Sequence, residues 1–402
     1  MDIIGQHSTI FYVLAFSFGL FLCWSIGAND VANTMGTAVG SGAISVRQAL
    51  ILAAVMELAG AYLAGGAVTA TIAKGILADT LFEPAPQLLV FGLIGALLAA
   101  GIWLMIATML GWPVSATHSI IGAVCGVGVA ALGFDAVRWD KMTEIVASWF
   151  ISPLLGAVVA WSLTLSIRKL IFNTENPIAQ ARRWAPMYAF LVGWIVSLVT
   201  ISTGLKHVNI FLSDFEGQLL SALIGIVLAI VARLMMNRIR LEERDDREFH
   251  FASVERLFVP LMVFTGAAMA FAHGSNDVAN GIGPLAAVVQ IIETQAVSSK
   301  SAVTPFMLFI GGVGIVFGLA THGYKIMATI GRGITELAGC TGWRRRRQRS
   351  RPTVPATCST RARTDAWTAS ITRPPRPGCC SCSRRAGRCA FTASSSRRAV
   401  PG

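Results

Sequence analysis

The sequence predicts an all-α polytopic membrane protein built from two inverted repeats, with broken helices and a re-entrant hairpin. Composition predicts the class, because 54% of the 402 residues are hydrophobic, only 13% are charged, and the mean hydropathy is +0.63. That is too apolar for an ordinary soluble protein. The string NDVAN occurs twice, each time after an apolar run, and predicts the repeats.

Eight stretches are long and apolar enough to cross a bilayer as helices, which takes about 20 residues each. They form continuous apolar runs and not the alternating pattern of a transmembrane β-barrel. No Lys or Arg precedes Arg47, so the first stretch lacks the basic segment of a cleaved signal peptide. We therefore expect an integral protein of the plasma membrane, surrounded by lipid. The stretches lie at about 9–27, 48–73, 87–110, 142–167, 185–204, 217–236, 256–272 and 302–322.

Two basic segments, 168–183 and 237–256, fix the expected topology. Two expected helices separate them, so they lie on the same side of the membrane, and the positive-inside rule makes that side cytoplasmic. The N-terminus is then expected to face outward. The chain divides into a first membrane repeat with connecting helices at 1–236, a cytoplasmic linker loop at 237–256, a truncated second repeat at 257–337 and an aberrant tail at 338–402.

Two motifs recur in the same order in the two halves of the chain. GANDVANTMGT at 27–37 and GSNDVANGIGP at 274–284 match at seven of eleven positions, 247 residues apart. ATIAKGI at 70–76 and ATIGRGI at 328–334 follow, 258 residues apart. Secondary transporters are often built from such repeats, with their sites at broken helices, and the inverted topology is inferred from that precedent.

The NDVAN strings place polar groups where a bilayer makes them costly. Each supplies a carboxylate and amide oxygens, and a glycine such as Gly27 is expected to let the backbone open and free carbonyl groups. These are hard oxygen ligands, suited to a small cation. The alternative is a polar contact between helices. The candidate cation-binding residues are Asn29, Asp30, Asn33, Asn276, Asp277 and Asn280.

Residues 111–128, GWPVSATHSIIGAVCGVG, predict an anion site. This charge-free segment fits a re-entrant helical hairpin, and a half-helix N-terminus offers free N–H groups and the positive end of a dipole. The hydroxyl groups of Ser115 and Thr117 add hydrogen-bond donors. The alternative is a helix contact lined by Ser and Thr, with a neutral core His118.

Glu57 is the lone acid of the second apolar stretch. An acid inside a membrane span is functional by default, although Glu57 could also be a structural partner of Lys74. Catalysis is not expected, because the sequence shows neither a P-loop nor a His/Cys metal cluster in its membrane part. We expect no enzyme activity, no cofactor, no metal beyond a coupling cation and no nucleic-acid partner.

With its doubled NDVAN and the string WPVSATHS, the chain resembles the inorganic phosphate transporter (PiT) family over about residues 8–337. The resemblance implies two inverted repeats, a homodimer, and uptake of inorganic phosphate coupled to sodium or protons. It also implies that the six NDVAN residues serve the cation and that Glu57 is critical for transport. Ala116 replaces a hydroxyl residue of the family pattern. The phosphate-binding residues implied are Ser115, Ala116, Thr117 and His118.

Two alternatives to phosphate transport stay open. Ser, Thr and backbone donors also suit another tetrahedral oxyanion such as sulfate. A different class is a membrane scaffold or receptor that transports nothing. The doubled intramembrane acid argues against the scaffold, whereas the absence of a second anion-binding hairpin argues for it.

The tail departs from the family pattern, in which the second repeat carries its own Ser-Thr-Thr-His hairpin. By the spacing of the first repeat, that hairpin falls near residue 370, where the chain reads WTASITRPPRPGCCSCSRR. Residues 341–402 hold fifteen Arg, no Lys and one acid, so the rest of the chain carries −2 of the formal +12. The tail is either a natural disordered segment or an out-of-frame reading of a GC-rich gene. An out-of-frame product lacks half of the phosphate site and is expected not to transport.

Overall fold

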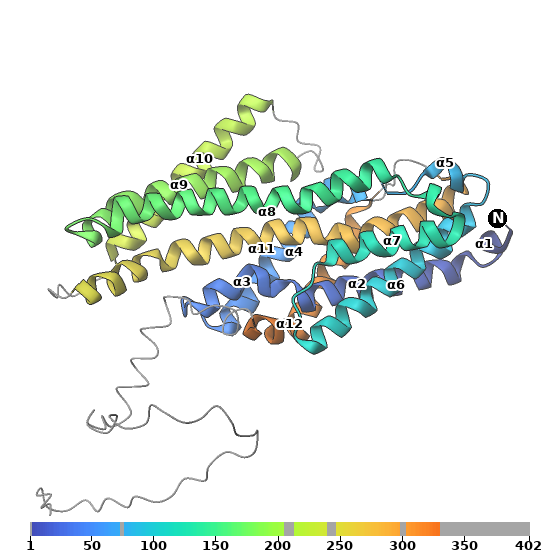
Figure 1. The fold of residues 1–402 in the computed structure, drawn as a ribbon, viewed down its shortest axis with the longest axis horizontal. Helices are drawn as coiled ribbons and strands as arrows, with labels where there is room; N and C mark the ends of the chain where they lie inside the picture. Colours follow the sequence, from blue (N-terminus) through green and yellow to red (C-terminus); the bar gives the residue numbers. More distant parts are fainter. Residues whose placement is uncertain (1, 73–75, 205–212, 239–246, 298–302, 330–402) are drawn as a thin grey trace, which may run out of the picture. The chain divides into compact units, whose positions relative to one another are not determined.

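The computed structural model describes residues 2–72, 76–204, 213–238, 247–297 and 303–329, and within them every regular element is a helix. One isolated bridge pairs Leu77 with Val137. Figure 1 shows the arrangement. The helices are α1 (Asp2–Gln6), α2 (Ser8–Asn29), α3 (Val31–Gly40), α4 (Val46–Ile72), α5 (Asp79–Phe82), α6 (Pro86–Leu110), α7 (Ala116–Leu132), η1 (Phe134–Ala136), α8 (Trp139–Ile167), η2 (Arg168–Phe172), α9 (Pro177–Gly204), α10 (Asp214–Arg238), α11 (Arg247–Thr294) and α12 (Pro305–Thr329).

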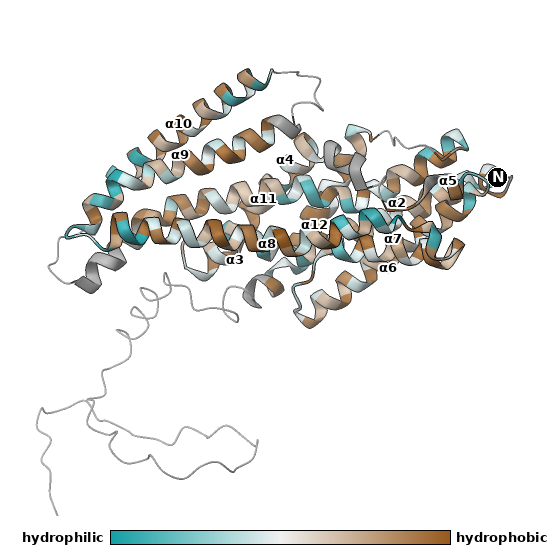
Figure 2. Ribbon diagram, turned by 45° about the horizontal axis from the view of Figure 1, so that its top comes forward, coloured by the Kyte–Doolittle hydropathy of each residue, from teal (hydrophilic) through white to brown (hydrophobic). Residues whose placement is uncertain are grey.

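Eight helical segments in the described part of the chain are long and apolar enough to span a membrane. Each overlaps one of the eight stretches expected from the sequence, which confirms the polytopic all-α prediction. Figure 2 shows apolar residues along most of the length of α8. The segments are Ser8–Gly40, Val46–Gly66, Pro86–Leu110, Trp139–Phe172, Pro177–Ile201, Asp214–Arg238, Leu257–Thr294 and Pro305–Tyr324.

The two NDVAN strings differ in backbone structure. The first lies at a break, because α2 ends at Asn29, α3 begins at Val31, and the amide of Asn33 bonds the carbonyl of Asp30 at 2.9 Å in a tightened turn. The second lies inside α11, which runs unbroken for 48 residues. The expected broken helix is therefore confirmed for the first copy and wrong for the second. A string without proline can remain helical, and α11 meets its next proline only at Pro284.

The glycines of the two motifs make close contacts between helices. A Cβ atom at Gly27 of α2 would clash with the backbone of Ile315 in α12, and one at Gly274 of α11 would clash with the backbone of Glu57 in α4. Gly27 therefore allows close packing, and the expectation that it opens the backbone is wrong. The two contacts are equivalent, because Glu57 and Ile315 are 258 residues apart, the offset of the second repeated motif.

The equivalent helices α2 and α11 run antiparallel. Gly19, early in α2, lies beside Leu285, late in α11, whereas Cys23 farther along α2 lies beside Gly281. Inverted repeats require that equivalent residues of the two copies make equivalent contacts and that equivalent helices run antiparallel. The contacts of Gly27 and Gly274 and the course of α2 and α11 meet both requirements. The inverted topology in the membrane stays a prediction.

Residues 111–128 do not form a hairpin by themselves. α6 ends at Leu110, Gly111 caps it with a φ of 75° in the left-handed region, and residues 112–115 have no regular structure before α7 begins. α7 then packs back along α6, with Val127 against Gly92. The hairpin thus consists of α6 and α7, and residues 111–115, which we call the hairpin tip, join its arms. Its re-entry into the membrane stays a prediction.

Residues within or beside the two basic segments lie at the same end of the α9–α10 pair, and their common side of a membrane stays a prediction. α9 and α10 pack as an antiparallel pair, and Ile171, Ala181, Met236 and Leu257 gather in one apolar cluster. The expected linker at 237–256 is helical at both ends, because α10 continues to Arg238 and α11 begins at Arg247. Residues 239–246 and the tail at 338–402 lie outside the described residues. Which side is cytoplasmic stays a prediction.

A thiol at the start of α2 tests the orientation. We expect Ser8→Cys to react with a membrane-impermeant maleimide in intact cells, because the positive-inside rule places the basic segments inside and the N-terminus outside. Glu175→Cys, in the short connection between η2 and α9, is the matched control and should react only after permeabilisation. The parent chain measures labelling of its native cysteines. The reverse pattern of labelling would reverse the topology.

Candidate cation and phosphate site

A cavity of about 340 Å³ lies where the break between α2 and α3, the hairpin tip and α11 meet. Residues far apart in the sequence line it. Some of them suit a cation as ligand and others suit an anion. Carboxylates come from α11 and from the break, whereas hydroxyl and backbone N–H donors come from the tip and the start of α7. The lining residues are Asp30, Asn33, Pro113, Val114, Ser115, Ala116, Thr117, His273 and Asp277.

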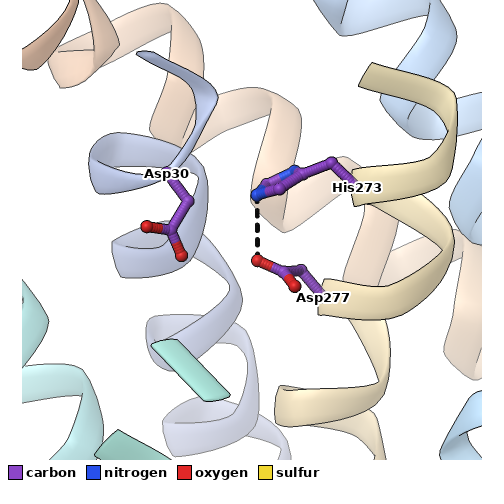
Figure 3. Close-up of side chains that lie close together, drawn as sticks. All are labelled: Asp30, His273 and Asp277. Atoms are coloured by element: carbon purple, nitrogen blue, oxygen red, sulfur yellow. Dashed lines mark ion pairs between the residues drawn. The ribbon is translucent and has the colours of Figure 1, made fainter. Parts of the chain in front are cut away.

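Two acids face each other in this cavity. One oxygen of Asp30, one oxygen of Asp277 and one ring nitrogen of His273 all lie within 4.8 Å of one another. Figure 3 shows the carboxylates of Asp30 and Asp277 directed toward each other from separate helices. Two like charges at this separation in a buried site need a neighbouring positive charge or a bound proton. The two carboxylates therefore offer oxygen atoms of the kind that a cation site uses.

His273 connects this cluster to Glu57. Its Nε2 lies 2.9 Å from Oδ2 of Asp277, and its Nδ1 lies 3.2 Å from Oε1 of Glu57, which is fully buried. Both ring nitrogens face a carboxylate, so the ring can donate to both only as a doubly protonated imidazolium. The sequence interpretation missed His273. The signal was available, because His273 is an ionisable residue directly after the apolar stretch 256–272 and one helical turn before Asp277.

Glu57 lies next to the cavity, on the far side of His273. It does not line the cavity, but it contacts His273, which does. The alternative partner considered for Glu57, Lys74, lies outside the described residues. The structure therefore gives Glu57 a contact with the acid pair through one imidazole ring.

The start of α7 supplies the anion-binding side of the cavity. Ser115 caps the helix, with its Oγ accepting from the backbone N–H of His118 at 3.3 Å. Thr117 and the backbone at Ala116 also line the cavity, and the N-terminal end of a helix favours an anion. His118 does not line it. Its ring lies 4.0 Å, between centroids, from that of Trp149 on α8.

The four asparagines of the NDVAN strings have four different environments. Asn33 lines the cavity. Asn29 bonds the hairpin tip and Asn280 bonds Thr117 through their side-chain amides. Asn276 is exposed and does not line the cavity. The structure thus brings Asp30, Asn33 and Asp277 together and leaves Asn276 apart; cation binding by these residues stays a prediction.

Removing the imidazole of His273 is expected to destabilise the protein strongly. His273→Ala leaves Glu57 and Asp277 buried without their shared positive partner, and breaking a buried ion pair typically costs about 3–5 kcal/mol. Thermal unfolding of the purified protein measures the loss. Adding Glu57→Gln to His273→Ala should recover part of it, because one unpaired buried acid is then gone. A His273→Ala protein as stable as the parent would show that the ring carries no such charge.

The sequence of the chain is similar to those of known proteins. A sequence model of the phosphate transporter family matches residues 26–344. A Haemophilus influenzae protein named as a phosphate permease is 43% identical over 344 residues, which cover 85% of this chain and 82% of the relative. The chloroplastic inorganic phosphate transporter 2-1 of Arabidopsis thaliana is 38% identical over 81% of this chain and 59% of its own length.

One solved structure, titled the sodium-dependent phosphate transporter, superposes with a TM-score of 0.75 at 35% sequence identity. The match covers 83% of this chain and 81% of that one. A superposition at this TM-score and identity shows that the two chains share a fold. On the family match over most of its length and on these relatives, the chain belongs to the phosphate transporter family.

Proposed function

We propose that this protein imports inorganic phosphate across the cell membrane by symport with a cation. One observation carries the proposal: a single cavity joins the donor-rich start of α7 to the acid pair Asp30 and Asp277. Hydroxyl and backbone N–H donors suit a phosphate oxygen, and the carboxylates suit a cation. Membership of the family supports phosphate as the anion.

The shared cavity gives a physical reason for coupling. Phosphate that enters beside Asp30 and Asp277 meets two negative groups, which repel it unless a cation lies between them. The membrane potential adds a second reason. Moving one charge across 100 mV costs about 2.3 kcal/mol, so a divalent phosphate entering a negative interior needs at least two cations to cancel that cost.

Sodium is the coupling ion that we propose to test first, with protons as the alternative. The solved neighbour named as sodium-dependent supports sodium. The site supports it chemically, because Oδ1 of Asp30 is buried and has no hydrogen-bond partner among the described residues. Such an oxygen is a natural ligand for a hard cation.

The proposed setting is the plasma membrane, with the protein as a homodimer surrounded by lipid. No residue of α8 is buried, and apolar side chains such as Phe150 and Trp161 are mostly exposed. A helix of this kind supports a lipid-facing or dimer-facing position. Chemical cross-linking in native membranes, followed by a shift of band mass, distinguishes a dimer from a monomer.

Uptake of radiolabelled phosphate by proteoliposomes tests the function. We expect uptake by the 402-residue chain to require an imposed inward sodium gradient and to exceed uptake by empty liposomes. Imposing a proton gradient in place of sodium identifies the coupling ion, and excess unlabelled sulfate tests the competing oxyanion. A correctly inserted protein that moves phosphate under neither gradient would contradict transport and match the non-transporting product expected from a missing second hairpin.

A further inference from the structure

We infer that Asn29 and Asn280 are positioning residues that link the acid pair to the phosphate-binding end of the hairpin, so that occupation of the cation site sets the affinity for phosphate. The inference rests on the proposed function and deepens it. It assigns the two amides a role other than cation ligation. Three observations carry it. They are the contacts of Asn29, the contacts of Asn280, and the positions of both residues next to the acids in the sequence.

Asn29 holds the hairpin tip from the side of α2. Its side chain is fully buried. Its Nδ2 donates to the carbonyl of Trp112 and to Oγ1 of Thr108, both at 3.0 Å, and its Oδ1 accepts from the amide of Val114 at 3.1 Å. Both amide N–H donors and the amide oxygen are therefore engaged by the end of α6 and the tip.

Asn280 reaches the same region from α11. It is 1% exposed, and its Nδ2 donates to Oγ1 of Thr117 at 3.1 Å and lies 3.5 Å from Oδ1 of Asp277. Its Oδ1 is buried without a hydrogen-bond partner among the described residues. One amide group thus touches both a hydroxyl of the proposed phosphate site and an acid of the proposed cation site.

The spacing of the motif connects each amide to an acid. Asn29 immediately precedes Asp30, at the break between α2 and α3, and Asn280 follows Asp277 by three residues on the same helix. Ala116, at the start of α7, lines the same cavity as Asp30. A cation that neutralises the two acids changes how closely their helices approach. The amides transmit that change to the residues that they contact in the hairpin, Trp112, Val114 and Thr117.

The consequence is a coupling free energy between two sites, which is reciprocal. Sodium should raise the affinity for phosphate, and phosphate should raise the affinity for sodium by the same factor. Typical factors are about 5–150-fold. Breaking the amide contacts should lower this factor toward one, while each ligand can still bind in the absence of the other.

Phosphate binding at a series of sodium concentrations tests the inference. Binding of radiolabelled phosphate to the purified full-length protein gives the coupling factor for the parent, Asn29→Ala and Asn280→Ala. We expect at least a five-fold loss of coupling in each variant. Thr321→Val is the matched control, because it breaks a comparable bond between helices, Trp24 Nε1 to Thr321 Oγ1 at 3.0 Å, outside the cavity. It should retain the parental factor.

A second measurement does not depend on phosphate. Ser115→Cys places a thiol at the end of the hairpin tip, and sodium should change its rate of reaction with a maleimide, measured against the parent chain. Asn29→Ala should abolish that sodium response. Unchanged coupling factors in both asparagine variants, or a sodium response that persists, would overturn the inference. A parent protein that binds no phosphate at any sodium concentration would instead overturn the proposed function, and the thiol measurement would still decide the linkage.

Discussion

Replacing Asp30 or Asp277 with asparagine is expected to reduce cation-dependent phosphate uptake to the level of empty liposomes. Asparagine keeps the shape of the side chain and removes its charge. The cluster in which both acids lie within 4.8 Å of each other then loses half of its negative charge. A cation bound between them loses one of its two carboxylate ligands.

The same variants should change stability in a way that does not depend on turnover. In the parent, sodium at 100 times its dissociation constant should add about 2.7 kcal/mol to the free energy of unfolding. In Asp30→Asn that increment should vanish. The variant without sodium should be more stable than the parent without sodium, because a buried like-charge contact has been removed. Thermal unfolding with and without sodium measures both effects.

An exposed acid provides the matched control for the same chemical change. Asp140, at the start of α8, forms a 3.6 Å ion pair with Arg138, and its side chain is 66% exposed. Asp140→Asn should leave the sodium-dependent stabilisation as in the parent, because exposed pairs contribute little. If Asp30→Asn and Asp277→Asn both transport and bind sodium normally, the acids are structural and the proposed cation site is wrong.

The sequence predicted the membrane spans and the acids because both are local signals. A run of about 20 apolar residues predicts a span, and a charged residue inside such a run is rare enough to attract attention. The doubled motif singled out Asp30 and Asp277 as candidate cation ligands, and the structure places them together. No tertiary information was needed for either step.

The roles of the amides could not be predicted, because they depend on contacts between distant segments. Thr117 and Asn280 are 163 residues apart, and Asn29 meets Val114 across 85 residues. Equal motifs predicted equal environments for Asn29 and Asn276, yet one is fully buried in contact with the hairpin and the other is exposed. The packing of α6 and the hairpin tip against α2 distinguishes them.

His273 was missed for a different reason. Its signal was local, but the doubled motif directed attention to the positions that the two copies share. The residue before Gly27 is Ile26, so the position of His273 has no polar counterpart in the first copy. A functional residue that occurs in only one of the two repeats is not found by comparing the repeats.

Shifting the reading frame of the gene near codon 338 is expected to restore a second hairpin with a P-x-S-x-T-H string and further apolar spans. The described structure supplies a reason that is independent of the composition of the tail. Asn29 is buried because the first hairpin contacts it, and its counterpart Asn276 is exposed on α11. A second hairpin in the equivalent place would cover Asn276 as the first covers Asn29.

Resequencing the gene decides whether the frame exists, and a thiol at Asn276 tests the packing. In the 402-residue chain, Asn276→Cys should react readily with a small maleimide, whereas in the frame-restored chain it should be protected. Sodium-dependent phosphate uptake should be faster in the restored chain than in the 402-residue chain, because the cavity gains the other half of its donors. Resequencing that finds no such frame would contradict the prediction.

Cells that carry the native gene separate the two origins of the tail. Sodium-dependent uptake by these cells indicates a faulty sequence record. Its absence indicates a frameshift present in the cell, whose product leaves the first hairpin in an incomplete bundle.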